Sequence, residues 1–537
     1  MNIRMATYIF SIMLLSIGFS ACQSAPAPEP IVETVEKVVE KVVEKVVEKV
    51  VTATPDAVPQ ELIVGLSALP TSLDPVQDNG LGSLATYDLL YDRLVDVDEK
   101  GMLQPSLAVS WKATSNTAWE FKLKDGVKFH NGEVFDATAA KFVLDRMLTA
   151  KESKFTTALK SVKASVTIVD PLTIRIETSE PVTYLASRFA TRAWMFAPKY
   201  FEQVGVEKFA SAPVGTGKFK AVEYQRDNRL VLERNDNYWR ERPKLSKITL
   251  LHMPDQTSRV NTVEAKGIDV AYVIDPEQAT RLEKSGFKTI NQPVGQGYQF
   301  FFRTGLNSPV SNVKVRQALS HAVDVETISK ALFGGMVRVL QGQPTGPDAA
   351  GWSSTIKAYP YDVQKAKSLL TEAGYPNGFS LQFDTTSGMA PKDKEVAELI
   401  ADQLSKVGVK VEIILNERGV YLDKLNNAKM APLWSISLNY APAFDITAPL
   451  FNFTCSPNHK SNCDKQLDAD YLKTTGTFDA AERSKLVAQQ LQYIHDQALA
   501  IFLWQVPGLY VVNPRVEGLK LRGDYTMDIT GTTVTKR

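Results

Sequence analysis

The sequence predicts a mixed α/β protein whose first part is rich in antiparallel strands and whose second part alternates helices with strands. Hairpin signals recur between residues 119 and 234, whereas long helical runs separated by short strands dominate after residue 303. The composition agrees, since 44% of the 537 residues are hydrophobic and 23% are charged, as in ordinary globular proteins. At roughly 150 residues per domain, this length suggests about three or four domains or lobes.

The charge balance and the metal-ligating residues exclude several classes of function. Lys and Arg number 61 against 60 Asp and Glu, so there is no basic excess to neutralise a phosphate backbone, and no nucleic-acid partner is expected. Three Cys and five His cannot supply a protein with several metal sites, and we expect no metal and no cofactor. A large soluble enzyme and a large binding protein remain.

Residues 1–21 have the pattern of an export signal. Arg4 precedes an apolar run of about 12 residues, too short to span the roughly 30 Å hydrocarbon core, and two small residues precede Cys22. The segment resembles a bacterial lipoprotein signal, which implies cleavage before Cys22 and lipidation of its sulfur. A plain secretory signal with an incidental Cys is the alternative, and in both cases the body is exported.

We expect a spacer and stalk at residues 22–59. A Pro-rich segment is followed by a V-V-E-K repeat of period four between Ile31 and Val51. Four residues turn an α-helix by ~400°, so an apolar stripe drifts and forms no straight seam. The repeat is either a stalk that lifts the body off the membrane or a partly helical linker.

The body begins at residue 60 with a region of strands. Asp125-Gly126, Asp170-Pro171 and Asp227-Asn228 are turn signals, and each is expected to join two strands into a hairpin. Helices are expected at Leu84–Val95 and at Ala137–Leu148, where Asp136 provides an N-cap. The expected strands are Glu61–Ser67, Trp119–Leu123, Val127–His130, Thr167–Val169, Thr173–Glu177, Lys218–Tyr224, Arg229–Arg234, Lys247–Leu251, Asp269–Val273 and Tyr298–Arg303.

After residue 303 the pattern is typical of αβ units. Between a helix and a strand, Gly408 can adopt the left-handed conformation that ends many helices. The expected helices are Val313–Leu332, Val363–Ala373, Lys392–Lys406 and Ala480–Asp496, and the expected strands are Ser380–Asp384, Lys410–Leu415 and Ala500–Trp504.

No catalytic motif has complete spacing. Gly215-Thr216-Gly217-Lys218 is similar to a phosphate loop, but Ala212 and Phe219 stand where that loop needs Gly and Ser or Thr, so a tight turn is the better interpretation. The histidines form no i,i+4 pair for a metal, and we expect His130 to make a structural hydrogen bond. We assign no catalytic residue. A triad defined only by geometry stays open, but binding is favoured over catalysis.

Cys455 and Cys463 bracket a short loop segment of the exported body. An oxidising compartment favours a disulfide between them, worth roughly 2–3 kcal/mol through loop entropy. A thiol pair that binds a metal is the alternative, but it lacks further ligands.

Seven segments of the body, taken in order, carry a family resemblance. The longest is WEFKLKDGVKFHNGEVFDATAAKFVL at Trp119–Leu144, and the others are SLDP (Ser72–Pro75), PSLAVSW (Pro105–Trp111), PVGTGKFK (Pro213–Lys220), LERNDNYW (Leu232–Trp239), VRQALSHAVD (Val315–Asp324) and AKSLLTEAGYPNGF (Ala366–Phe379). Together they resemble family 5 of the extracellular solute-binding proteins, the peptide, oligopeptide and nickel class. The resemblance covers nearly the whole body, from about Glu61 to Leu521.

This resemblance implies an α/β, two-lobed periplasmic-binding-protein-like fold with an extra subdomain. The chain would cross between the lobes near Arg303 and near Trp504, and these two crossings would act as a hinge. The implied boundaries are 60–105, 195–303 and 505–537 for lobe I, 106–194 for the extra subdomain and 304–504 for lobe II. Such a protein closes on a solute and delivers it to the permease of an ATP-binding-cassette importer, and it performs no chemistry.

A cleft of this kind captures its solute with aromatic area and a few polar groups. Relatives often hold a peptide's α-amine with an Asp-Pro-Asp segment, but the corresponding segment here has only Asp445, which is also an N-cap candidate. Relatives that bind dipeptides place an Arg in a loop where this chain has residues such as Ser387. The candidate ligand-binding residues are Asp74, Tyr298, Phe300, Trp352, Trp434, Tyr440, Phe444, Asp445 and Trp504. Turn formation by Asp74 and core packing by the aromatic residues are the alternatives.

The sequence therefore predicts a solute-binding protein tethered by Cys22 to the outer face of the cytoplasmic membrane. Its body is expected to be monomeric, its solute a peptide or a peptide-like polar molecule, and its partner an importer permease. An exported hydrolase of peptides or glycans and an envelope sensor with the same fold are the alternatives.

Overall fold

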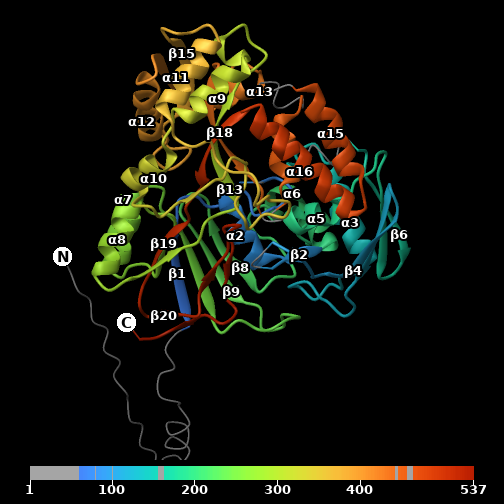
Figure 1. The fold of residues 1–537 in the computed structure, drawn as a ribbon. Helices are drawn as coiled ribbons and strands as arrows, with labels where there is room; N and C mark the ends of the chain where they lie inside the picture. Colours follow the sequence, from blue (N-terminus) through green and yellow to red (C-terminus); the bar gives the residue numbers. More distant parts are fainter. Residues whose placement is uncertain are drawn as a thin grey trace, which may run out of the picture. The chain divides into compact units, whose positions relative to one another are not determined.

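Three β-sheets organise the body in the computed structural model (Figure 1). The structure describes residues 60–536 except 79, 99–100, 155–161, 442–444 and 456–463. The predicted signal peptide, Cys22 and the stalk lie outside the described residues. The body, Pro59–Arg537, is one compact unit, so the start predicted at residue 60 is one residue from its boundary.

The first sheet has seven strands and forms lobe I. Its central strand β1 pairs in parallel with β10 and β11, and Leu62 and Val64 of β1 are fully buried. The other strands join antiparallel, which agrees with the hairpin-rich pattern of this part. In sheet order the strands are β12 (Lys288–Asn291), β19 (Leu509–Val512), β11 (Val270–Ala271), β1 (Glu61–Leu66), β10 (Lys247–His252), β9 (Arg229–Arg234) and β8 (Phe219–Gln225).

A four-stranded antiparallel sheet forms the extra subdomain. Its strands, in sheet order, are β4 (Ala108–Ser115), β5 (Ala118–Leu123), β7 (Thr173–Glu177) and β6 (Ser165–Asp170). Helix α3 (Ala137–Thr149) packs on β6 and β7, and the predicted cap is present, since the Asp136 carboxylate accepts a hydrogen bond from Ala139 N. Helix α5 (Leu185–Arg192) follows the sheet.

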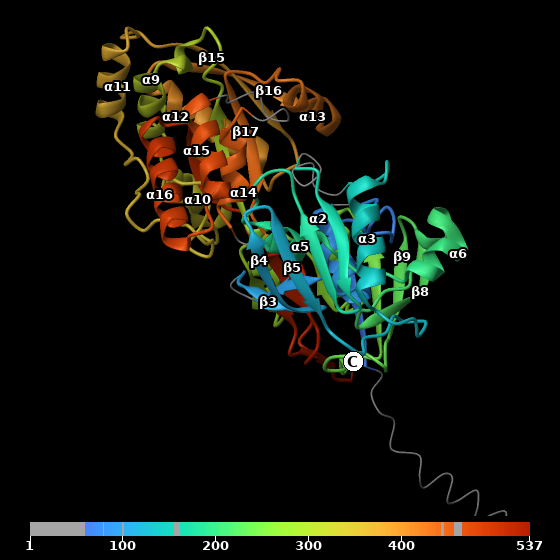
Figure 2. The same cartoon turned by 90° about the vertical axis from the view of Figure 1, so that its right-hand side faces the viewer.

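The second large sheet forms lobe II. Its strands, in order, are β14 (Arg338–Val339), β18 (Ala500–Gln505), β13 (Gln296–Phe302), β17 (Leu433–Asn439), β15 (Phe379–Thr386) and β16 (Val409–Asn416). Helices gather around it in Figure 2, and α12 (Asp393–Ser405) packs on β15 and β16. Gly408 has φ 85° just before β16, which confirms the left-handed position expected between helix and strand.

The remaining elements are short strands and surface helices. Two-stranded ribbons pair β2 (Val95–Val97) with β3 (Leu103–Pro105), β20 (Val516–Glu517) with β23 (Thr533–Val534), and β21 (Lys520–Leu521) with β22 (Met527–Asp528). The helices not yet described are α2 (Leu81–Leu90), α6 (Pro198–Phe209), α7 (Gln256–Glu264), α8 (Pro276–Lys284), η1 (Pro309–Ser311), α9 (Val313–His321), α10 (Val325–Phe333), α11 (Val363–Glu372), α12 (Asp393–Ser405), α13 (Arg418–Asn426), α14 (Thr447–Leu450), η2 (Phe451–Phe453), α15 (Lys465–Gly476) and α16 (Ala480–Asp496).

The chain crosses between the two large sheets at two places. The first crossing lies between Asn291, the end of β12, and Gln296, the start of β13. The second lies between Gln505 and Leu509. The lobe I boundary predicted at residue 303 was therefore placed too late, because β13 pairs with β17 and β18 of lobe II.

Two other sequence predictions are wrong. Val127–His130 does not pair with Trp119–Leu123, because β4 and β7 occupy both edges of that strand. The helix expected at Val313–Leu332 is divided into α9 and α10, and Asp324 caps the second by accepting from Thr327 N. The hairpins β6–β7 and β8–β9 are confirmed.

Candidate functional site

A crevice of about 130 Å³ lies between the extra subdomain and lobe II. One wall is α5, and the other is the segment that follows β17. It is lined by Tyr184, Ser187, Arg188, Arg192, Asn439, Tyr440, Ala441, Asp445, Thr447 and Ala448. Separate parts of the fold therefore supply the two walls of the crevice.

The lobe II wall begins with Asn439 and Tyr440. Asn439 ends β17, and its side-chain oxygen accepts a hydrogen bond from Ala441 N at 3.0 Å. Tyr440 is buried, and its hydroxyl accepts from Gly346 N at 3.3 Å. Burial raises the pKa of Tyr440 well above its ordinary value, so its hydroxyl stays protonated and neutral.

Asp445 completes this wall, and its carboxylate is already engaged. Its Oδ1 accepts from Thr447 N at 2.8 Å and from Thr447 Oγ1 at 2.6 Å. Arg483 Nη2 of α16 lies 2.9 Å from Oδ2 and 3.3 Å from Oδ1. Asp445 therefore combines a turn-forming role at the start of α14 with an ion pair, while one side of it faces the crevice.

The subdomain wall is cationic. The guanidinium carbon of Arg188 lies 5.0 Å from the ring centroid of Tyr184, which is a cation–π distance. Burial, followed by the charges of Arg93 and Arg188, lowers the pKa of Arg192 to about 10, so the side chain still carries its charge at neutral pH. The helix therefore presents two positive charges to the crevice.

Lobe II contacts the rest of the body at both sides of the molecule. On the subdomain side, Thr183 donates to the carbonyl of Thr475 from both its backbone N (3.1 Å) and its Oγ1 (2.9 Å). On the lobe I side, Lys392 Nζ lies 2.6 Å from Glu277 Oε1. These contacts join separate parts of the fold and must break if the crevice opens widely.

A buried polar network lies near the second crossing. The Gln505 amide donates to Asp348 Oδ2 at 2.8 Å and to the carbonyl of Val294 at 3.0 Å. Arg338 Nη1 donates to Gln505 Oε1 at 3.0 Å. The network connects both crossing segments with the loop behind Tyr440.

Four of the predicted aromatic residues lie in the core of lobe II rather than on the crevice wall. Tyr298 packs on Phe300 and Trp504, with ring centroids 5.7 and 6.1 Å apart. Trp434 stacks on Phe301 at 5.0 Å. Tyr298, Phe300, Trp434 and Trp504 are each at most 2% exposed. This burial agrees with the alternative interpretation, in which these aromatic residues pack in the core.

The other predicted residues are dispersed. Asp74 is fully buried, and its carboxylate binds Arg146 through two hydrogen bonds, which are 2.9 and 2.5 Å long. Its Oδ1 also accepts from Val76 N, so Asp74 ties the loop after β1 to α3. Trp352 is half-buried and follows the turn after Ala349. Of the nine candidates, Tyr440 and Asp445 line the crevice.

Two further predictions fall partly outside the described residues. Phe444 and Cys463 lie outside the described residues. Cys455 is disulfide-bonded. The pairing of Cys455 with Cys463 stays a prediction.

The sequence reasoning missed Arg188, Arg192 and Asn439. The segment LASRFATR carries arginines four residues apart, which would place both on one helix face. The four-residue spacing is the signal in the sequence that could have indicated Arg188 and Arg192 as neighbours in one site. The face that meets the crevice could not be read from sequence, because lobe II supplies the opposite wall.

The glycine-rich turn Gly215–Gly217 has a structural role. Ideal Cβ atoms on Gly215 and Gly217 would lie 2.1 and 2.3 Å from backbone atoms of Leu90, so the turn packs directly on the end of α2. His130 fastens the turn, since its Nδ1 accepts from Gly215 N at 3.2 Å and its Nε2 donates to the Gly217 carbonyl at 3.0 Å. The structural hydrogen bond expected of His130 is confirmed.

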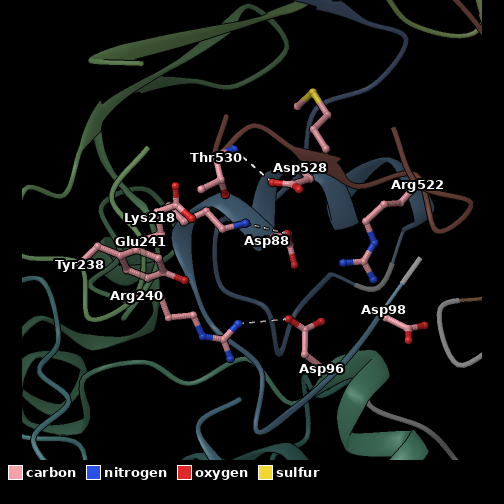
Figure 3. A pocket seen from close by; sticks show the side chains of 11 residues that line it. Asp88, Asp96, Asp98, Lys218, Tyr238, Arg240, Glu241, Arg522, Asp528 and Thr530 are labelled. Carbon is pink, nitrogen blue, oxygen red and sulfur yellow. Dashed lines mark hydrogen bonds and ion pairs between the residues drawn. The ribbon is translucent and has the colours of Figure 1, made fainter. Parts of the chain in front are cut away.

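A second pocket, of about 560 Å³, is lined by charges that pair with one another (Figure 3). Lys218 Nζ lies 3.4 Å from Asp88 Oδ2, and Arg240 Nη1 lies 3.6 Å from Asp96 Oδ2. Burial acts against the charge of Asp88, but Lys218, Arg93 and Arg522 hold its pKa well below its ordinary value. The pocket lies within lobe I and its C-terminal ribbon, so its walls do not move apart with the lobes.

None of the described helices has both the length and the apolar character that a bilayer crossing requires. Within the described ranges, no three His, Cys, Asp or Glu side chains are grouped to hold a metal ion.

Comparisons with known proteins agree with this architecture. Residues 102–458 match the family model described as bacterial extracellular solute-binding proteins, family 5. Heme-binding protein A of Haemophilus influenzae is 29% identical over 470 residues, covering 81% of this chain and 85% of the relative. Glutathione-binding protein GsiB of Pectobacterium atrosepticum is 29% identical over 486 residues, which cover 88% of this chain and 92% of the relative.

A solved structure shares the fold. NikA from Brucella suis, in complex with Fe(III)-EDTA, superposes with a TM-score of 0.79 at 24% identity, covering 88% of this chain and all of that one. The predicted two-lobed α/β fold is thereby confirmed.

Proposed function

Because the chain belongs to family 5 of the bacterial extracellular solute-binding proteins, we propose that it captures a peptide or peptide-like solute between its lobes and delivers it to the permease of an ATP-binding-cassette importer. The observation that carries the proposal is the crevice walled by α5 on one side and by Asn439–Ala448 on the other. A solute that fills a site shared between lobes favours the closed form, and that form is the one a permease can distinguish.

The proposal extends to how the protein is held at the membrane. Cleavage before Cys22 and lipidation of its sulfur would tether the body to the outer face of the cytoplasmic membrane, with residues 22–59 as the spacer. Cys22→Ser is expected to move the protein from the membrane fraction to the soluble exported fraction. Equal membrane association of the variant would contradict the tether.

Peptide-like solutes are supported by the names of relatives as well as by the resemblance. One relative is named for glutathione, itself a tripeptide, and one solved neighbour, DppA from Helicobacter pylori, holds the peptide STSA. Another relative is named for heme. The test therefore uses short peptides, glutathione and heme as probes.

The test compares a blocked crevice with a matched surface change. Ser187 lines the crevice and Ser484 is exposed on α16, so Ser187→Trp fills the crevice while Ser484→Trp adds the same ring elsewhere. Calorimetry on the exported body should show that a probe binds the wild type and Ser484→Trp equally. Binding should be lost in Ser187→Trp. Equal binding by both variants would place the solute outside this crevice.

A further inference from the structure

A pair of aromatic rings joins the extra subdomain to lobe II. The ring of Trp119, on β5, lies 5.9 Å from the ring of Phe478, in the segment between α15 and α16, and the two ring planes are 34° apart. Aromatic pairs at such distances contribute free energy beyond that of the area they bury. The indole Nε1 of Trp119 donates to the Val182 carbonyl at 3.0 Å, which fixes the orientation of this ring on the subdomain.

The segments next to the ring pair add polar and close-packed contacts. Thr183 donates to the Thr475 carbonyl from its backbone N at 3.1 Å and from its Oγ1 at 2.9 Å, so both lone pairs of that carbonyl are used. An ideal Cβ on Gly476 would lie 3.6 Å from Cβ of Pro181, which is ordinary van der Waals contact. Tyr184, the residue after Thr183, lines the crevice. The contacts are therefore continuous with the crevice.

The extra subdomain is packed as part of lobe I, whereas lobe II is packed separately. One hydrophobic core contains Phe121 of the subdomain together with Leu62 and Leu250 of lobe I. Lobe II has cores of its own. The chain passes from the subdomain into lobe I before it reaches lobe II, so the contacts between Trp119 and Phe478 join two bodies without a direct covalent connection. A rotation at the two crossings would make or break these contacts.

We propose that the extra subdomain holds lobe II in the closed form through a latch, which consists of Trp119, Pro181 and Thr183 on the subdomain and Thr475, Gly476 and Phe478 on lobe II. This inference rests on the proposed capture of a solute between the lobes. The latch contributes the same free energy to closure whichever solute is bound, so it raises the affinity for every solute that the crevice accepts. Selection among solutes is left to the crevice.

Phe478→Ala removes the lobe II ring of the latch, and Phe379→Ala is its matched control. Phe379 is half-buried like Phe478, but its ring packs on Tyr375 within lobe II, with the ring centroids 5.1 Å apart. Calorimetric titration of the exported body uses glutathione, heme and Ala-Ala-Ala as probes. Phe478→Ala should lower the affinity for every probe that binds by the same factor, about 3- to 10-fold. Phe379→Ala should leave each affinity unchanged.

Two conservative variants test the hydrogen bonds of the latch. Thr183→Val keeps the shape of the side chain but removes its hydroxyl donor, so it should lower each affinity by about 2- to 10-fold. Thr183→Ser keeps the donor and should bind each probe like the wild type. In both Thr183→Val and Phe478→Ala, the loss should appear as faster dissociation with little change in the association rate, because the latch forms after the solute enters.

A double variant tests whether the two rings act through one contact. Trp119→Ala and Phe478→Ala each remove the ring pair, so the double variant Trp119→Ala/Phe478→Ala should bind the probes about as weakly as the weaker single variant. If the two losses of affinity multiply instead, the rings act independently and the latch is contradicted.

A distance measurement that needs no solute tests the latch separately. Lys112 of β4 and Lys485 of α16 are exposed, and spin labels attached to Lys112→Cys and Lys485→Cys report the separation of the subdomain from lobe II. Double electron–electron resonance on the exported body should give longer distances in Phe478→Ala than in the wild type. Phe379→Ala should give the wild-type distances.

The outcomes distinguish this inference from the proposed function. The latch is overturned if Phe478→Ala leaves both the distances and the affinities at their wild-type values. It is also overturned if the affinity falls for one probe alone, since that result would place Phe478 in contact with the solute. If none of the probes binds the wild type, the proposed function fails, and the distances alone decide whether the latch exists.

Discussion

Replacing His130 by Gln is expected to remove a pH-dependent part of the stability of the body. In the folded protein the neutral imidazole accepts from Gly215 N and donates to the Gly217 carbonyl. A proton on Nδ1 would replace the first hydrogen bond by repulsion. Burial, with a further contribution from Lys220, lowers the pKa of His130 from 6.5 to about 4, although the Gly217 hydrogen bond acts against this.

The lowered pKa of His130 determines the sign and the size of the change in stability with pH. Below pH 6.5 the unfolded chain binds the proton first, so the free energy of unfolding decreases as the pH falls from 6.5 to about 4 and then levels off. The full difference corresponds to about 3 kcal/mol. Because part of the residue reaches the surface, water screens the imidazolium, and we expect about 1–2 kcal/mol.

Urea unfolding of the exported body at several pH values between 7 and 4 measures the effect. The wild type should lose stability over this range by about 1–2 kcal/mol more than His130→Gln, since every other titrating group is shared. Parallel profiles for the two proteins would show that the His130 ring gains its proton as readily in the fold as in the unfolded chain, and the reasoning would be refuted.

Three further changes test other parts of the fold. Gly217→Ala should destabilise the body by about 3 kcal/mol or more, because its Cβ would lie 2.3 Å from the backbone of Leu90; a small change in the urea midpoint would contradict that packing. Arg146→Met leaves the fully buried Asp74 without its cation and should lower the free energy of unfolding by about 3–5 kcal/mol at pH 7. The double variant Arg146→Met/Asp74→Asn should recover part of that stability, because the buried charge is then removed as well. Lys392→Gln should change the free energy of unfolding by less than about 1 kcal/mol, because its partner Glu277 is exposed. If this ion pair joins the lobes only in the closed form, the same change should measurably weaken solute affinity.

The sequence predicts the local elements well because their signals are local. Asp136 caps α3 through its own third neighbour, and Asp227-Asn228 turns β8 into β9 within a few residues. Such features depend on short-range hydrogen bonds and turn geometry, which are encoded by adjacent residues.

The sequence alone does not predict which sheet a strand joins or which elements form the walls of the crevice. The strand QGYQFFF is buried at six of its seven positions, so its pattern does not tell which sheet it joins. The predicted lobe boundary at residue 303 is wrong by the length of this strand. An aromatic side chain offers area to a ligand and to a core alike, and Phe300 and Trp504 use that area in the lobe II core. Arg188 acquires its place in the crevice only when lobe II supplies Asn439 and Asp445.

We propose that a peptide-like solute is held between α5 and Asn439–Ala448. The most direct measurement is a crystal structure of the exported body grown with a saturating short peptide or glutathione. We predict solute atoms within about 4 Å of residues on both walls of the crevice. A peptide seated instead among Asp88, Lys218 and Arg522, with the crevice holding none, would contradict the account.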